Sequence, residues 1–535
     1  MKYAIKLLNK RKFILCFIDS FIVNLCIYLL PLVLAMFTKE PFTLEKFAYL
    51  IISIAVLKTV EILLNHVWIV YILRFETRYA KDLQLAYFNR VANMNPFKLN
   101  KVHNGYLKKQ IDIAAEESEE FMEYIFETVN GFVISVVIFL IQVIQQDIKM
   151  FFFCVAMLVA IIIYNIIIGK RHVVVQEEYN KEYSKYNATY VDFLQNIKTV
   201  KRLHATKYAN IKNEEAFQRV VPKLDKTNTY YSFRSSGISF FVYFMFVIIL
   251  LNLYAKMKSG QDILSYLLFY ATIFSGLSGE LKDLARLFIH YNKFQAASTQ
   301  VEKMIGKEEE NKVIKTWTSI EIKNLVFNYD KETKNNISIP KFEMKQKEKI
   351  SIVGRSGQGK TTFLNILARY IQIPEENYLI DGEKQKGNLD LAYISQEIDL
   401  FNLTVKENLC LGRKIADEVL MQYIKEAGLL EWIQGLEKGL DTVVGERGLK
   451  LSVGQKQRLN IIRGILLDKS MYILDEPTSN LDKETEKLIV DLIEKYLHEK
   501  TVVIVTHREE IKRMCNKHYQ FENGIMQLEG EKSLL

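Results

Sequence analysis

Eight residues beyond the middle of the chain combine glycines with a lysine and a hydroxyl side chain at fixed spacing. They are Gly354, Arg355, Ser356, Gly357, Gln358, Gly359, Lys360 and Thr361, and they match G-x-x-x-x-G-K-[ST] at every defined position. Glycines let backbone N–H groups approach phosphate oxygens, the lysine reaches the β- and γ-phosphates, and the threonine hydroxyl is suited to hold Mg²⁺. The spacing therefore predicts a phosphate-binding loop.

The residues on either side of this loop have the pattern that such a loop requires, a buried strand before it and a helix after it. Residues 349–353 read Lys-Ile-Ser-Ile-Val, a short apolar strand, and residues 362–368 place apolar side chains at helical spacing. The alternative is a glycine-rich turn that matches the pattern by chance, and this context disfavours it.

Two further strands are predicted to end in side chains that suit phosphate chemistry. Residues 471–474 are apolar and lead into Asp475 and Glu476, a pair suited to holding Mg²⁺ and to acting as a base. Residues 501–505 are also apolar and lead shortly into His507. Because ligands in α/β sheets gather at the carboxyl ends of the strands, we expect these side chains to meet the loop at one sheet edge.

Two more sites could contact a nucleotide. Ser452 precedes a predicted helix as its N-cap, so the free N–H groups of that helix can take an anion. Tyr329 follows two predicted strands, residues 320–322 and 325–327, and its ring could stack on an adenine. A tyrosine that serves only the core or the surface is the alternative for Tyr329.

Together these motifs resemble the nucleotide-binding domain of an ABC transporter over residues 320–528. The resemblance implies ATP and Mg²⁺ as cofactors. It implies that Glu476, Gln396 and His507 are catalytic and that Thr361, Gln396 and Asp475 are metal ligands. It further implies nucleotide contacts at Tyr329, Gly354, Ser356, Gly357, Gln358, Gly359, Lys360, Thr361 and Thr362, and, in the family signature, at Ser452, Gly454 and Gln455.

Other positions of the same half match the family less fully. Asp482 corresponds to the D-loop, where Asn480 stands in place of the usual alanine. Val453 replaces the first glycine of the usual signature pair. Neither change removes a phosphate donor or a base, so we expect ATPase activity to survive, and the affinity of the signature is what Val453 puts in question.

The apolar residues of the chain are concentrated in its first half. The 535 residues are 49% hydrophobic and carry a formal net charge of +9. A basic excess could indicate nucleic-acid binding, but basic residues also accumulate on the cytoplasmic side of membrane proteins, and we favour that interpretation. The five cysteines have no paired or metal-ligand spacing, so neither disulfides nor a zinc site are predicted.

Six apolar stretches are predicted to cross the membrane, namely residues 13–37, 47–73, 125–145, 150–169, 238–254 and 263–277. A basic cluster in residues 2–12 places the N-terminus in the cytoplasm. The long, basic connections after the second and fourth spans then also lie in the cytoplasm, where we expect them to continue as helices. Because the first span begins at once, we expect no peptidase domain before it.

Three ionisable residues fall inside predicted spans, where charge is costly. Lys58 and Glu61 lie three residues apart and share a helix face, and Asp19 lies in the first span. They either line a water-filled path or, for the pair, form a buried ion pair that fixes helix register. The sequence leaves both open.

Six spans before one nucleotide domain resemble the exporter group of ABC transporters. The predicted fold is a multi-domain membrane protein with a six-helix all-α transmembrane domain (1–305), a linker (306–318) and an α/β P-loop ATPase domain (319–535). Pro96 and Phe97, with Gly105 and Asp112, resemble the first coupling-helix region of that group. Residues 192–201 resemble the stretch that leads to the second.

The predicted function is ATP-driven export of a peptide, drug or lipid by a homodimer in the cytoplasmic membrane of a bacterium. The alternatives are one half of a heterodimeric exporter and a gated sensor or channel subunit. A soluble nucleic-acid-associated ATPase is excluded by the six spans. The predicted partners are a second transporter half, the bilayer and an exported substrate whose identity the sequence does not give.

Overall fold

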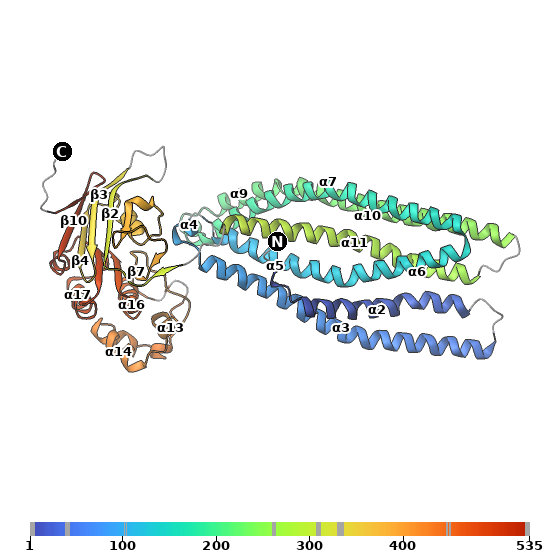
Figure 1. The fold of residues 1–535 in the computed structure, drawn as a ribbon, viewed down its shortest axis with the longest axis horizontal. Coiled ribbons are helices and arrows are strands. Elements are labelled where there is room, and N and C mark those ends of the chain that lie inside the picture. The colour runs from blue at the N-terminus through green and yellow to red at the C-terminus, as the bar shows by residue number, and fades with distance from the viewer. Residues whose placement is uncertain are drawn as a thin grey trace. The chain divides into compact units, whose positions relative to one another are not determined.

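The computed structural model describes residues 6–37, 43–100, 102, 104–258, 264–306, 312–328, 336–445, 448 and 451–529. The chain divides into two compact units, one made of 1–94 with 101–308 and the other of 95–100 with 309–535. The first is helical and the second is built on a β-sheet (Figure 1). Residues 95–100, which the sequence placed with the spans, therefore pack in the second unit.

The first unit is helical, and most of its helices are long. They are α2 (Lys10–Phe37), α3 (Leu44–Ala92), α5 (Asn104–Tyr124), the π-helix η1 (Ile125–Val129), α6 (Asn130–Gln146), α7 (Ile148–Gln195), α8 (Ile197–Arg202), α9 (Thr206–Gln218), α10 (Val221–Lys258) and α11 (Leu264–Ile305). Figure 1 shows α7 and α10 side by side along most of their length. With 49 residues in α3 and 48 in α7, these helices exceed the length needed to cross a bilayer, and the predicted helical continuation beyond the spans is confirmed.

Five helical stretches in the described part of the chain are long and apolar enough to cross a membrane. They are Lys10–Phe37, Leu44–Ala92, Gly105–Gln146, Ile148–Gln195 and Thr206–Lys258. These five contain the first five predicted spans. The sixth begins outside the described residues and otherwise lies in α11, which does not reach the same hydropathy because serine, glycine and tyrosine interrupt its apolar residues.

The third predicted span contains a local widening of the helix at η1. A π-helical turn displaces backbone carbonyls from their usual partners four residues on, and a side chain must satisfy them. The Ser20 hydroxyl of α2 donates to the Phe126 carbonyl in η1. The Asn130 side chain, which follows η1, donates to the Phe17 carbonyl at 3.0 Å. Buried polar contacts thus fix α2 against η1 and α6.

The second unit is organised around a sheet of nine strands in the order β5-β2-β3-β11-β10-β4-β9-β8-β7. The strands are β2 (Ser319–Phe327), β3 (Ile337–Lys345), β4 (Lys349–Gly354), β5 (Tyr378–Ile380), β7 (Leu391–Ile394), β8 (Met471–Asp475), β9 (Thr501–Val505), β10 (Lys517–Glu522) and β11 (Ile525–Leu528). A separate two-stranded sheet pairs β1 (Val313–Ile314) with β6 (Asn388–Leu389). The two strands predicted in 320–327 form one strand, β2, through which Asn324 passes with a φ of 50°.

Helices cover this sheet and complete the second unit. They are α4 (Pro96–Asn100), α12 (Lys360–Leu367), η2 (Glu375–Asn377), α13 (Val405–Cys410), α14 (Asp417–Glu426), α15 (Leu430–Gln434), η3 (Gly439–Asp441), α16 (Val453–Ile465), α17 (Lys483–Leu497) and α18 (Glu509–Arg513). Figure 1 shows α13 and α14 gathered at one end of the unit, away from β2 and β3. The signature helix α16 packs against α13, α14 and α17.

The central strands are buried on both faces, as expected for parallel strands covered by helices. Every residue of β8 and β9 is buried. Alternate residues belong to different cores: Val502 packs in the core that contains α16 and α17, and Val503 in the core that contains α12. The strands that carry the predicted site are therefore held from both sides.

The short helix α4 packs on the second unit, although the chain on either side of it belongs to the first. Its Phe97 packs against the core that contains α12. The Asn95 side chain accepts a hydrogen bond from the Phe97 amide at 2.9 Å and donates one to the Arg369 carbonyl at 3.3 Å. The segment that resembles a coupling helix is thus anchored by one aromatic ring and one amide side chain.

Lys58 and Glu61 are paired within α3. Lys58 Nζ lies 2.7 Å from Glu61 Oε2, and the glutamate side chain is only 18% exposed. An unpaired carboxylate in a membrane span carries a desolvation cost that its partner offsets. We therefore test the alternative in which Lys58 and Glu61 form an ion pair that stabilises the fold.

We expect Glu61→Gln to lower the melting temperature of the detergent-purified protein by several degrees, since it leaves Lys58 without its partner. Exchanging the two residues, Lys58→Glu with Glu61→Lys, should restore most of the loss. Glu215→Gln is the matched control, because Lys212 and Glu215 form an ion pair of the same spacing that is exposed on both sides. If Glu61→Gln melts like the wild type and alters only substrate-stimulated ATPase, the pair serves the path and the structural assignment is wrong.

Candidate active site

Four neighbouring strands deliver the predicted site residues to one edge of the sheet. The order β4-β9-β8-β7 is parallel throughout. The glycine-rich loop follows β4 and His507 follows β9. Asp475 is the last residue of β8, Glu476 comes directly after it, and Gln396 follows β7. The expected convergence is therefore present.

The loop between β4 and α12 has a backbone that only glycine adopts without strain. Gly354 has a φ of 154° and Gly359 a φ of 104°. A Cβ atom at Gly354 would lie 2.8 Å from the Phe521 carbonyl oxygen, and one at Gly359 would lie 2.5 Å from Ile337 Cδ1. The loop therefore lies directly against β3 and β10, which leaves its amide groups to face a ligand at the start of α12.

Lys360 is held back over the loop that it ends. Its ammonium group donates to the Gly354 carbonyl and, at 3.1 Å, to the Arg355 carbonyl. Burial lowers the pKa of Lys360, and the nearby carboxylates Glu476 and Asp475 act in the opposite direction. A buried ammonium of this kind is stabilised when an anion replaces the carbonyl groups as its partner.

Thr361 and Asp475 form the second contact of the site. The Thr361 hydroxyl donates to Asp475 Oδ2 at 3.0 Å, and Asp475 is only 4% exposed. Burial raises the pKa of this carboxyl, and the hydrogen bond from Thr361 partly opposes the shift. A hydroxyl and a carboxylate held this close are oxygen ligands of the kind that Mg²⁺ prefers, so the donor set fits that ion.

Glu476 lies beside Asp475 and faces Gln396. Gln396 Nε2 donates to Glu476 Oε2 at 2.9 Å. Glu476 has a φ of 49°, a backbone state that is unusual for glutamate, and its amide donates to the Val505 carbonyl at 3.0 Å. The strained turn directs the chain away from the sheet at the point where a base is expected.

His507 approaches the same group of side chains from β9. Its Nε2 atom lies 3.5 Å from Lys360 Nζ. His507, Lys360 and the Asp475–Glu476 pair thus form one cluster, as the strand ends predicted.

The signature residues make a separate structure at the start of α16. Ser452 Oγ accepts from the Gln455 amide at 3.2 Å and the Ser452 amide donates to Gln455 Oε1 at 2.9 Å, so the predicted N-cap is confirmed as a capping box. Val453 is 57% exposed. In the described part of the chain, no hydrogen bond joins Ser452, Gly454 or Gln455 to residues 354–361.

The other predicted residues occupy less informative positions. Ser356 is exposed, and Gln358 Oε1 is buried without a hydrogen-bond partner among the described residues. Thr362 is buried in α12. Asp482 is the N-cap of α17 and accepts from the Thr485 amide at 2.9 Å. Tyr329 lies outside the described residues.

Gln457 is a site residue that the sequence analysis missed. Its side chain, 5% exposed, donates to the Glu476 carbonyl at 3.2 Å and to the Pro477 carbonyl at 2.7 Å. It therefore ties the signature helix to the turn that carries Glu476. The available signal was its position: Gln457 shares the buried face of α16 with Ile461 and Ile465, where an amide needs a polar partner.

The chain is similar in sequence to known transport proteins. Residues 337–479 match the ABC transporter family model. The chain is 36% identical over 269 residues to an ATP-dependent lipid A-core flippase of Pseudoalteromonas translucida, a match covering 47% of this chain and 46% of that protein. It is 37% identical over 212 residues to a putative multidrug export ATP-binding/permease protein of Staphylococcus aureus, with 38% and 37% covered. These matches span about half, or less, of the curated relatives.

A solved structure shows the same fold over nearly the whole chain. A bacterial Atm1-family ABC exporter with ATP bound superposes with a TM-score of 0.84 at 20% identity, covering 97% of this chain and 95% of that one. The family model of the ABC transporter transmembrane region matches residues 12–281, about half of the chain. With a transmembrane region of that type followed by an ABC transporter ATPase region, this multi-pass membrane protein belongs to the ABC transporter family.

Proposed function

We propose that this chain is one half of an ATP-driven exporter and works as a homodimer. The observation that carries the proposal is the cluster at the sheet edge, where Thr361 meets Asp475 at 3.0 Å and Gln396 meets Glu476 at 2.9 Å. The first pair would hold a metal ion that neutralises phosphate charge, and the second would hold a water molecule beside the phosphates. The same chain carries helices able to cross a membrane, so hydrolysis and transport reside in one polypeptide.

The loop and its lysine bind the phosphates of ATP. Backbone amides at the start of α12 point towards the anion and the helix dipole favours it. Lys360 exchanges the Gly354 and Arg355 carbonyls for phosphate oxygens. Thr361 and Asp475 hold Mg²⁺, which when bound neutralises the charge that develops on the phosphates. The family resemblance assigns the stacking on adenine to Tyr329.

Glu476 acts on the attacking water. Its carboxylate orients the water or accepts its proton, and Gln396 fixes the carboxylate through the hydrogen bond of 2.9 Å. Gln457 holds the backbone of the same turn from below. We assign His507 to the γ-phosphate, and its position beside Lys360 supports this assignment. Because Gln457 lies on α16, a small movement of that helix reaches the turn that carries Glu476.

The proposal of a dimer follows from the separation of Ser452 from the loop. The capped N-terminus of α16 offers amides to an anion, yet no hydrogen bond joins it to residues 354–361 in the described chain. A second copy facing the first head to tail brings Ser452 and Gly454 to the γ-phosphate of the partner and forms two equivalent sites. ATP binding then closes the dimer and hydrolysis releases it.

Transmission to the membrane half runs through α4. Its Phe97 packs in the core that contains α12, the helix that begins at Lys360. Movement of the ATPase unit therefore carries α4 and the chain on either side of it. We place the protein in the cytoplasmic membrane of a bacterium, with the N-terminus and the ATPase domain in the cytoplasm. The relatives make a lipid or a drug the first substrates to test, with a peptide as the third.

Transport itself is tested with inverted membrane vesicles that contain the protein. A fluorescent lipid, an amphipathic dye and a labelled peptide represent the three substrate classes. We expect ATP-dependent movement of at least one probe, absent from vesicles that carry Glu476→Gln. If no probe of any class moves while the purified protein hydrolyses ATP, the export assignment fails and a gated response takes its place.

Changing Glu476 to glutamine should separate ATP binding from turnover. The amide keeps the size of the side chain but neither accepts a proton nor carries charge, so we expect ATPase activity to fall roughly 100-fold or more. Binding of a fluorescent ATP analogue should stay close to the wild type. Glu484→Gln, at an exposed position in the first turn of α17, is the control and should hydrolyse ATP normally.

Two outcomes would contradict this role. If Glu476→Gln hydrolyses ATP nearly as fast as the wild type, Glu476 is not the catalytic base. If ATP binding is lost together with hydrolysis, the residue contributes to ATP affinity instead. Lys360→Ala is expected to give that second pattern, because the lysine contacts phosphate in the ground state as well as in the transition state.

Disulfide trapping tests the dimer. In a background without the five native cysteines, Arg355→Cys and Val453→Cys place thiols at exposed positions beside the loop and the signature. We expect cross-linking between chains, faster with ATP in the Glu476→Gln protein. Arg355→Cys with Glu494→Cys, at an exposed position of α17, is the control and should not cross-link. Cross-links within one chain, or an active monomer by mass, would rule out the mechanism.

A further inference from the structure

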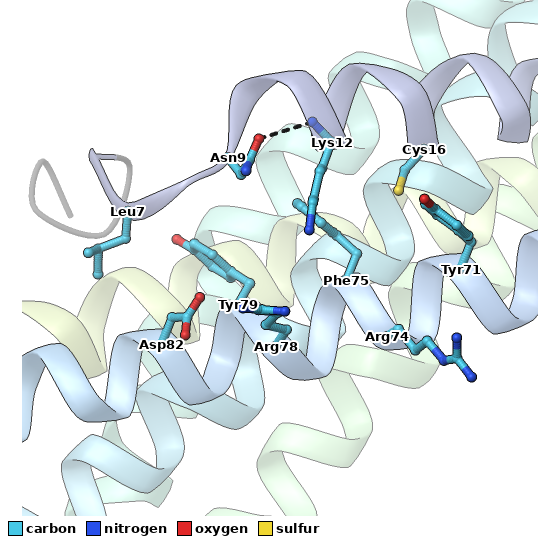
Figure 2. A pocket seen from close by; sticks show the side chains of 10 residues that line it. All are labelled: Leu7, Asn9, Lys12, Cys16, Tyr71, Arg74, Phe75, Arg78, Tyr79 and Asp82. Atoms are coloured by element: carbon cyan, nitrogen blue, oxygen red, sulfur yellow. Dashed lines mark hydrogen bonds between the residues drawn. The ribbon is translucent and has the colours of Figure 1, made fainter.

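A pocket that the ATPase cycle does not use lies between the first two long helices of the helical unit. Its volume is about 420 Å³, and its lining includes Lys12 of α2 and Arg74, Arg78 and Asp82 of α3. Figure 2 shows the Lys12 side chain extending from α2 towards α3, near Phe75 and Arg78. Both helices belong to one compact unit, so the pocket has defined walls.

Helical spacing explains why these side chains gather. On α3, Tyr71, Arg74, Arg78 and Asp82 recur at intervals of three and four residues, which places them on one face. On α2, Lys12 lies one turn from Cys16, whose buried side chain faces the same helix. The pocket is thus formed by one stripe from each helix.

The lining has an unbalanced positive charge. The residues that line the pocket include three cations and one carboxylate, that of Asp82. Among the described residues, the side chains of Lys12, Arg74 and Arg78 make neither a hydrogen bond nor an ion pair, whereas many other basic residues of this chain do, as Lys293 does with Glu117. Because these three cations have no such partner among the described residues, the pocket stabilises a bound anion.

The pocket lies where the apolar part of both helices ends. The first apolar stretch begins at Phe13, directly after Lys12, and the second ends at Leu73, directly before Arg74. Next to the cations, Ile14 is 55% exposed and Leu73 is 50% exposed. Tyr71, 56% exposed, is of the residue type enriched at the level of lipid headgroups. A ligand that fits both parts has an anionic head and apolar chains.

We propose that this pocket binds the headgroup of an anionic phospholipid, with the acyl chains along the exposed apolar faces of α2 and α3. The phosphate lies between Lys12 and Arg78, where charge-assisted hydrogen bonds form, and Arg74 adds positive charge further along α3. The Asp82 carboxylate accepts hydrogen bonds from headgroup hydroxyls, which favours phosphatidylglycerol over a headgroup without donors. Free inorganic phosphate matches the cations but not the apolar surface, so the lipid is the ligand to test.

The binding test uses the full-length protein, delipidated in detergent and titrated with phosphatidylglycerol or with phosphatidylcholine of the same acyl chains. Native mass spectrometry counts the lipids bound, and thermal unfolding reports stabilisation. The pocket variant is Lys12→Gln with Arg78→Gln. Its matched control is Arg11→Gln with Lys81→Gln, which removes the same charge from exposed positions of the same two helices outside the lining.

We expect wild type and control to bind phosphatidylglycerol alike, and the pocket variant to bind it about tenfold more weakly. Lys12→Arg, which keeps the charge, should retain binding and shows that the site tolerates substitution. Excess inorganic phosphate should not displace the lipid, and displacement would identify free phosphate as the ligand and overturn the proposal. Equal losses in the pocket variant and the control, or equal binding of phosphatidylcholine by the wild type, would also overturn it.

Discussion

The parallel register of three strands is the constraint on which the site depends. Ile352 of β4 and Asp475 of β8 both pair with Val505 of β9, so the three strands end at one level. The glycine-rich loop begins two residues beyond Ile352, which places Thr361 within 3.0 Å of Asp475. A slip of one residue in β8 would turn the Asp475 side chain to the other face of the sheet and separate the pair.

Burial of charged groups raises the free energy of the site when no ligand is bound, so a ligand of opposite charge stabilises it. Lys360 and Asp475 are both buried, and burial shifts their pKa values towards the neutral form of each. In the proposed function, phosphate and a divalent cation would supply the missing counter-charges, so the free energy of ATP binding would compensate for a cost already present in the fold. Glu476 adds a strained backbone to this site, with its carbonyl held by Gln457 and its carboxylate held by Gln396.

The local sequence pattern was sufficient to predict the site residues that lie at the ends of apolar strands. Asp475 and His507 lie at or just beyond the ends of apolar runs that were predicted to be buried strands, and their convergence was expected from the rules of parallel sheets. The packing of Phe97 was beyond this reasoning, because its core is built from residues that lie more than two hundred positions later in the chain. Asn324 was a different case, since a single residue with positive φ lets one strand continue where the sequence suggested two.

The central claim is that the loop, Thr361 and Asp475 form one metal–nucleotide site, and Mn²⁺ tests it most directly. Electron paramagnetic resonance measures free Mn²⁺ as it titrates Glu476→Gln protein loaded with ATP, with and without Asp475→Asn. Loss of the carboxylate should weaken Mn²⁺ binding by roughly tenfold or more, since a charged oxygen ligand is removed. Identical Mn²⁺ affinity in the two proteins would show that Asp475 does not face the metal, and the account of the site would be wrong.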